Sequence, residues 1–206
     1  MLPVKTLADN NNLNINAESA ILIDGDTGKI LYEKSAYEKR APASTTKIMT
    51  ALLALEHCKT TDVATVTSEA ITSVPSGYST DLLKMGEELT IKDLLYALLL
   101  PSSNEAANVL AIHIAGSIDS FASMMNTKAM DLGCKNTHFV NPNGVHDDNH
   151  YSTAYDLAGI AKEAMKTDIF RQIVSTASYT LPNSNKYSRI AVSYTHLRAH
   201  ETGRNL

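Results

Sequence analysis

A run of apolar residues at helical spacing follows a Ser-Thr-Thr-Lys segment in the first third of the chain. After residues 44–47 come Ile48, Met49, Leu52, Leu53 and Leu55. Intervals of three and four place these side chains on one wide face of a helix. Such a face has to be covered by other elements, so the chain is predicted to fold around this helix. Ser44 is expected at or near the first turn.

A hairpin is predicted before this helix, and more helices after it. The β-prone runs 20–23 and 30–32 flank a loop over 24–28, whose glycines permit the positive φ of a hairpin turn. Thr90 and Asp93 form an N-cap pair for a helix over 91–99. Further elements are predicted as helices over 104–114, 118–132 and 153–165, and as a strand over 178–181.

Charge and hydropathy exclude several classes of protein. The 206 residues include 18 Lys+Arg against 22 Asp+Glu, a formal net charge of -4, so nucleic acid is not expected as a partner. Apolar runs such as 94–100 are far shorter than the roughly 20 residues that cross a bilayer. Cys58 and Cys134 are too far apart for a Cys-x-x-Cys pair and are interpreted as buried hydrophobes. Residues 1–16 show no signal-peptide pattern, so the chain is either cytosolic or lacks its original beginning.

Ser44 and Lys47 are candidates for nucleophilic catalysis. A serine three residues before a lysine on a helix puts both side chains on one face, within hydrogen-bond reach. A serine hydroxyl needs a base, and a lysine can serve if burial and a second cation keep its amine neutral. Alone, Ser-x-x-Lys also fits a helix cap followed by a solvated lysine. The one Ser-x-Asn of the chain, Ser102 to Asn104, strengthens the catalytic interpretation, because penicillin-binding proteins and class A β-lactamases combine both motifs with a later Lys-Thr-Gly.

Three stretches of the sequence resemble a known family. Residues 17–24, residues 39–51, and Asn141-Pro142-Asn143-Gly144 together with residues 152–158 are similar to the serine D-alanyl-D-alanine carboxypeptidases. These are the low-molecular-mass penicillin-binding proteins of bacterial cell-wall metabolism. The resemblance implies the α+β fold of β-lactamases and DD-peptidases (transpeptidase-like), with an antiparallel sheet packed against helices, a helical subdomain and a cleft between them.

The resemblance also implies a serine acyl-enzyme mechanism on peptidoglycan stem peptides that end in D-Ala-D-Ala. Ser44 would attack the penultimate D-Ala carbonyl and Lys47 would take its proton. Ser102 would relay a proton to the leaving D-Ala, while Asn104 would hold Lys47 and the substrate amide. β-Lactams would trap Ser44, and neither metal nor cofactor is expected. By resemblance the site of action is extracytoplasmic, in the cell envelope, with membrane contact only through anchor segments that this chain lacks.

The sequence departs from the family pattern near its end. It contains no Lys-Thr-Gly, which in the family supplies a cation for the substrate carboxylate and a donor to the oxyanion hole. Loss of one such donor costs about 10²–10³ in rate, so the printed chain is expected to be inactive. Residues 192–206 resemble a translated sequencing adapter. We therefore predict a flexible lead-in over 1–16, a partial catalytic domain over 17–191 that is incomplete at its C-terminus, and a non-native tail over 192–206.

Other interpretations stay open at this point. A D-Ala-D-Ala endopeptidase or a class A β-lactamase could use the same fold, although no counterpart of the β-lactamase glutamate loop is visible. A non-catalytic domain that binds β-lactams or the cell wall is a third alternative. His146 and His150 flank two aspartates in an Asn/Pro/Gly-rich loop, and are interpreted as solvated rather than metal-binding. Glu87 and Glu88 are interpreted as a solvated helix end.

Overall fold

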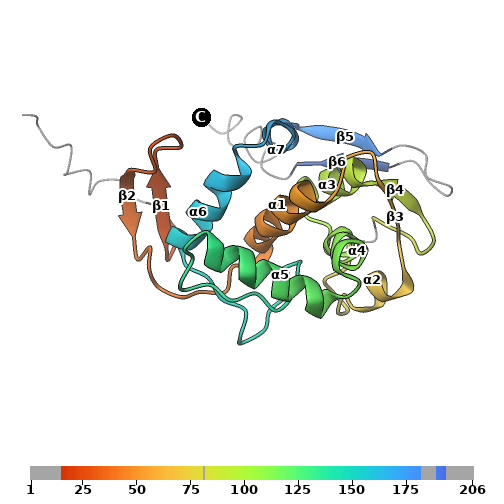
Figure 1. The fold of residues 1–206 in the computed structure, drawn as a ribbon, viewed down its shortest axis with the longest axis horizontal. Helices are drawn as coiled ribbons and strands as arrows, with labels where there is room; N and C mark the ends of the chain where they lie inside the picture. Colours follow the sequence, from red (N-terminus) through yellow and green to blue (C-terminus); the bar gives the residue numbers. More distant parts are fainter. Residues whose placement is uncertain (1–14, 81, 182–188, 194–206) are drawn as a thin grey trace, which may run out of the picture.

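The computed structural model describes residues 15–80, 82–181 and 189–193. Helix α1 lies at the centre, surrounded by the other long helices (Figure 1). The elements in chain order are β1 Ala20–Ile23, β2 Ile30–Lys34, the 3₁₀ turn η1 Ala43–Thr46, α1 Lys47–His57, β3 Val63–Thr65, α2 Ser68–Thr72, β4 Glu88–Thr90, α3 Ile91–Leu99, α4 Asn104–Ala115, α5 Ile118–Asp131, α6 Ala154–Ala164, α7 Asp168–Val174, β5 Ser178–Leu181 and β6 Arg189–Val192.

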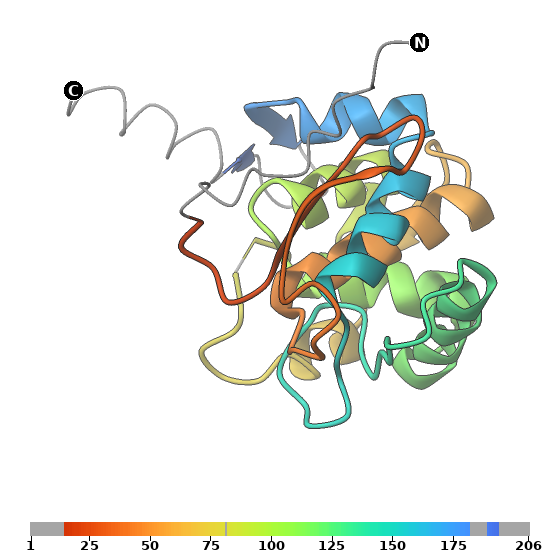
Figure 2. The same ribbon diagram turned by 90° about the vertical axis from the view of Figure 1, so that its left-hand side faces the viewer.

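The predicted hairpin at the start of the chain is confirmed. Strands β1 and β2 pair antiparallel, with Leu22 opposite Tyr32. Asp24 fixes the turn, because its Oδ1 accepts hydrogen bonds from the backbone N–H and the hydroxyl of Thr27 at 2.8 and 2.6 Å. Gly28 takes the positive φ of 76° that this turn requires. Figures 1 and 2 show the hairpin lying over α6, against which β1 packs.

The core forms around α1, as its apolar pattern predicts. Met49, Leu52 and Leu53 of α1 are buried against α3, α4 and α6. Helix α3 is buried over almost its whole length, since Leu94, Leu95 and Leu98 are all inaccessible to solvent. The predicted caps are also present: Thr90 accepts from the Asp93 N–H, and Thr153 from the Asp156 N–H. Gly116 ends α4 in the left-handed conformation.

The described strands form three separate two-stranded antiparallel sheets, β1–β2, β3–β4 and β5–β6. The mixed helix and strand content agrees with the predicted fold class, but the expected single antiparallel sheet is not formed by these strands. The two outer hairpins pack on different helices. Strand β1 lies on α6, whereas Tyr179 of β5 stacks on Tyr96 of α3 at 3.7 Å between ring centroids and donates to Asp93 at 2.8 Å.

Several short elements were not predicted from the sequence. These are β3, α2, β4, α7 and β6, each seven residues or fewer. Segments this short contain too few residues to show a helical or strand period. Most of the predicted lead-in and tail, residues 1–14 and 194–206, lies outside the described residues. Within the part that is described, no helix has the length and apolar character needed to cross a membrane.

Candidate active site

Ser44 and Lys47 lie where the 3₁₀ turn η1 meets α1. Ser44 is exposed in η1, and Lys47 is the first residue of α1. The Lys47 side chain points into the protein and is only 2% exposed. Its Nζ lies 3.1 Å from Ser44 Oγ. The predicted contact between an accessible hydroxyl and a buried amine is therefore present.

Two oxygen atoms complete the surroundings of the Lys47 amine. Asn104 Oδ1 lies 2.8 Å from Nζ, and the backbone carbonyl of Asn143 lies 2.7 Å from it. Both oxygens can only accept hydrogen bonds, whereas the Ser44 hydroxyl can also donate. A neutral amine fits this arrangement: its two N–H groups go to the two oxygens, and its lone pair faces Ser44. That is the geometry in which a lysine can take a proton from a serine.

Burial allows the Lys47 amine to lose its proton near physiological pH. Desolvation lowers the pKa of Lys47 from 10.5 to about 8, and the negative charge of Glu105 partly opposes this shift. The sequence interpretation invoked burial and a second cation to lower this pKa. Burial acts as expected, but the charged neighbour that acts on Lys47 is an anion, Glu105.

Glu105 is a buried carboxylate that the sequence interpretation missed. It follows Asn104 in the first turn of α4 and is almost completely buried. Burial opposes ionisation of this carboxyl, but hydrogen bonds from Ser79, Thr80 and Ser103 outweigh it and lower its pKa below the usual value. An acidic residue in a first helical turn is common because it suits the helix dipole, so no local pattern indicated a buried role for Glu105.

The remaining predicted residues lie at the link between α3 and α4. The Asn104 side chain is held in a fixed orientation, because its Nδ2 donates to the Tyr78 carbonyl at 2.7 Å while its Oδ1 faces Lys47. Ser102 adopts a left-handed backbone conformation, with φ 63°, which is unusual for a residue other than glycine. Its hydroxyl makes no hydrogen bond with any described residue. Ser102 thus lines the site without a side-chain hydrogen bond to Ser44, Lys47 or Asn104.

A hollow of about 510 Å³ opens beside these residues. Its polar lining residues are Ser44, Thr45, Lys47, Ser102 and Ser193. The rest of its lining is mainly apolar and comes from α1, the end of α3, α6 and α7: Ile48, Leu98, Leu99, Leu100, Ala161, Met165, Phe170 and Val174. A ligand in this hollow would contact both the exposed serine and apolar side chains.

The loop that follows α5 packs against the start of α1. Besides the Asn143 carbonyl on Lys47, the Pro142 carbonyl accepts a hydrogen bond from Thr50 Oγ1 at 2.6 Å. Gly144 lies so close to η1 that a Cβ atom there would be 1.9 Å from the Ala43 carbonyl oxygen. The sequence identified residues 141–144 as a turn and as one of the stretches that carry the resemblance, without a role in the site. The contribution of this turn to the site is a backbone carbonyl, which no side-chain motif can indicate.

Gly144→Ala is expected to destabilise the protein by about 2–5 kcal/mol. Gly144 has φ +85°, so alanine would add left-handed strain of about 1–2 kcal/mol to an overpacking cost of about 1–3 kcal/mol. Chemical denaturation measures the change. The matched control is Gly159→Ala in α6, where a Cβ meets nothing within 4 Å and the stability should be unchanged or slightly increased. Equal stabilities for the two variants would contradict the close packing at Gly144.

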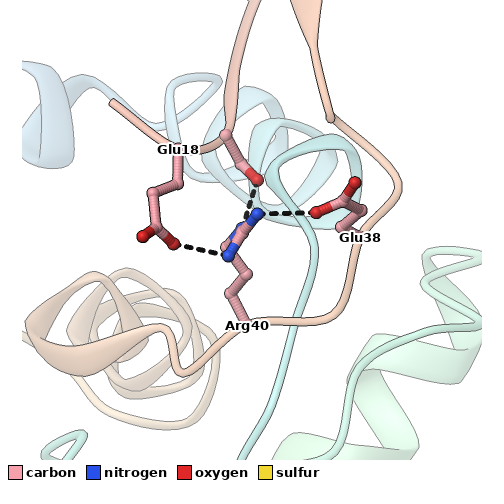
Figure 3. A network of polar contacts seen from close by, with 4 residues as sticks. Glu18, Glu38 and Arg40 are labelled. Atoms are coloured by element: carbon pink, nitrogen blue, oxygen red, sulfur yellow. Dashed lines mark hydrogen bonds and ion pairs between the residues drawn. The ribbon is translucent and has the colours of Figure 1, made fainter. Parts of the chain in front are cut away.

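Arg40 anchors the segment that leads to Ser44 (Figure 3). Its guanidinium forms ion pairs with Glu18 and Glu38 and donates to Ser19 Oγ at 2.6 Å. Its backbone pairs with Ser152 through two hydrogen bonds of 2.8 and 2.9 Å. Exposed ion pairs contribute little to stability, so the main effect of these Arg40 contacts is to hold segments in position. The residues before β1, the approach to Ser44 and the start of α6 are held together.

Two interpretations of polar residues are wrong. His150 was taken as solvated, but it is 3% exposed and its ring contacts Thr46 and the backbone of Val140. Glu87 was taken as a solvated helix end, but it is fully buried. Both lie in segments rich in polar residues, where tertiary packing rather than local composition decides burial. Among the described residues, no cluster of three or more His, Cys, Asp or Glu side chains is arranged to hold a metal ion.

Comparison with known proteins gives a consistent set of relatives. A family model described as D-alanyl-D-alanine carboxypeptidase matches residues 5–198. The D-alanyl-D-alanine carboxypeptidase DacF of Bacillus subtilis is 43% identical over 176 residues, which are 82% of this chain and 44% of DacF. The D-alanyl-D-alanine carboxypeptidase of Streptomyces sp. strain K15 is 37% identical over 85% of this chain and 64% of its own length. The chain thus spans between two fifths and two thirds of these two relatives.

Solved structures show the same relationship. The crystal structure of the Streptomyces K15 DD-transpeptidase superposes with a TM-score of 0.79 at 34% identity, covering 87% of this chain and 74% of that one. The D-alanyl-D-alanine carboxypeptidase of Mycobacterium tuberculosis H37Rv gives a TM-score of 0.78 at 32% identity, covering 86% of this chain and 66% of that one. The α+β DD-peptidase fold predicted from the sequence is therefore confirmed.

Proposed function

Because the chain belongs to the D-alanyl-D-alanine carboxypeptidase family, we propose that it is the catalytic part of a serine acyl-enzyme hydrolase. Its substrate would be a peptidoglycan stem peptide ending in D-Ala-D-Ala, from which it removes the terminal D-Ala. The observation that carries this proposal is the contact of an exposed serine hydroxyl with a buried lysine amine. The other two partners of that amine accept hydrogen bonds and leave its lone pair to the serine.

The proposed mechanism starts with proton transfer from Ser44 Oγ to Lys47 Nζ. Ser44 Oγ forms a bond to the carbonyl carbon of the penultimate D-Ala, and the amide bond to the terminal D-Ala breaks. Ser102, which lines the same hollow, would relay the proton from Lys47 to the departing amine, and Asn104 would keep Lys47 oriented. Water then hydrolyses the ester. β-Lactams would acylate Ser44 in the same way, and the enzyme would act outside the cytoplasmic membrane.

The test uses a K-T-G chimera, in which the residues after Ala191 are replaced by the corresponding Lys-Thr-Gly-containing segment of a relative. The D-Ala released from a pentapeptide ending in D-Ala-D-Ala is measured, alongside the turnover of penicillin. We expect D-Ala release, together with a penicillin adduct that turns over slowly. Cleavage of cross-linked peptides without D-Ala release would indicate an endopeptidase, and fast penicillin turnover a β-lactamase. Penicillin binding without covalent attachment would favour a non-catalytic binding domain.

A further inference from the structure

His150 is the one buried histidine among the described residues, and both of its ring nitrogens are engaged. The backbone N–H of Val140 donates to Nδ1 at 3.1 Å, and Thr46 Oγ1 lies 2.8 Å from Nε2. A backbone N–H can only donate, so Nδ1 carries no proton. The proton of the neutral ring is therefore on Nε2, which donates to Thr46.

Burial keeps His150 neutral over a wide pH range. Burial lowers its pKa from 6.5 to about 4. The negative charge of Asp147 opposes this shift, while the neighbouring His138 and His146 add to it. From η1, the uncharged Thr46 contacts the ring, and Phe139 packs against it edge-on at 5.6 Å between centroids. The Nε2–H donor is thus retained wherever Lys47 titrates.

The hydrogen bond to Thr46 joins two parts of the site that are distant in the sequence. Thr46 is fully buried and directly precedes Lys47. His150 belongs to the same loop as Asn143, whose carbonyl contacts Lys47 Nζ at 2.7 Å. The loop is also fixed at its base, because Asn126 of α5 makes two hydrogen bonds of 2.8 Å with the Phe139 backbone. His150 therefore fastens the Asn143 segment to the helix end that carries Lys47.

We propose that His150 is a positioning residue for the acyl transfer: its Nε2–H, through Thr46, keeps the Asn143 carbonyl against Lys47 and Lys47 within reach of Ser44. The role in acyl transfer rests on the proposed function. The effect of His150 on the Lys47 amine does not, and it can be measured whether or not the chain is active.

The first measurement is the pKa of Lys47 in the 206-residue chain, by NMR titration of labelled lysine, with the signal assigned by its loss in Lys47→Met. His150→Gln replaces the rigid ring with one flexible amide, which does not hold the Val140 N–H and Thr46 Oγ1 in place together, so the loop is released. Water then reaches Lys47, and its pKa is expected to rise from about 8 by about one unit or more toward 10.5. Thr46→Val should do the same, and Thr46→Ser, which keeps the hydroxyl, should preserve the wild-type value.

The matched control is His146→Gln, the same change at an exposed histidine of the same loop. It should leave the Lys47 pKa unchanged. If His150→Gln and Thr46→Val lower the melting temperature but leave that pKa unchanged, His150 is merely structural and the proposal is overturned. If His150→Gln does not fold, the comparison of Thr46→Val with Thr46→Ser tests the proposal instead. In the wild-type chain, ¹⁵N shifts of His150 showing the proton on Nδ1 would also overturn it.

The K-T-G chimera supplies an independent measurement. His150→Gln is expected to slow penicillin acylation by up to about 10²-fold, the cost of displacing a reacting group by about 1 Å. An inactive wild-type chimera would count against the proposed function, while the Lys47 pKa would still test the coupling. An active chimera whose rate and Lys47 pKa are both unaffected by His150→Gln would overturn the positioning role alone.

Discussion

Ser44→Ala in the K-T-G chimera is expected to abolish covalent labelling by a fluorescent penicillin and the release of D-Ala. The Ser44 hydroxyl is the exposed group that contacts the Lys47 amine, at 3.1 Å. Alanine has no atom that can form the ester, so the effect is complete for labelling. Loss of a serine nucleophile in a comparable enzyme costs about 10⁶ in kcat. The label on a denaturing gel and a D-Ala assay give the two readouts.

The control for Ser44→Ala is Ser68→Ala, an exposed serine at the start of α2. This variant should be labelled like the wild type. Since Ser44 is exposed, its replacement should leave the melting temperature nearly unchanged, which separates lost chemistry from lost folding. Labelling that persists in Ser44→Ala, at a site mapped by mass spectrometry to another residue, would show that the nucleophile has been assigned wrongly.

Lys47→Met is expected to lower the acylation rate by about 10²–10⁴, the usual contribution of a general base. In the wild-type chimera the rate should rise with pH and level off above about 8, because only the neutral amine can take the Ser44 proton. Below that pH the rate falls about tenfold per unit. Stopped-flow measurements of penicillin acylation between pH 5 and 10 would show the step, which should be missing in Lys47→Met.

A second variant tests the charge that acts on Lys47. Glu105 raises the Lys47 pKa and so opposes the effect of burial. Glu105→Gln should therefore move the rise in acylation rate to lower pH. Lys128→Met, which removes a lysine paired with Glu56 on α1, is the matched control and should leave the profile unchanged. A profile that is flat in the wild type would contradict the assignment of Lys47 as the base.

Elements with a strong local signal were predicted well. The boundaries of α3, Ile91–Leu99, and its Thr90 cap are as predicted, because a capping residue and an apolar period both depend on residues close together in the sequence. The β1–β2 hairpin follows from the glycine-containing loop between its strands. The short helix α2 and the strands β3 and β4 were missed, since their few residues are held by neighbours rather than by their own periodicity.

The site likewise contains residues that local motifs identified and residues that they did not. Ser44, Lys47, Ser102 and Asn104 were identified from two motifs, and the structure brings three of them into contact. The roles of these four residues in catalysis stay predictions, as do the boundaries of the catalytic segment at residues 17 and 191. Glu105, Asn143 and His150 were missed or misassigned, because each acts through burial or a backbone group.

The sequence by itself determined that the serine and the lysine share one helical face, because residues three apart do so both in an α-helix and in the 3₁₀ turn that contains Ser44. It also determined the position of the Ser-x-Asn link between two helices. Only the tertiary structure decided that Lys47 is buried and that the loop after α5 supplies its third partner. Desolvation and the contact between residues 47 and 143 depend on how distant segments pack, and no local pattern encodes that packing.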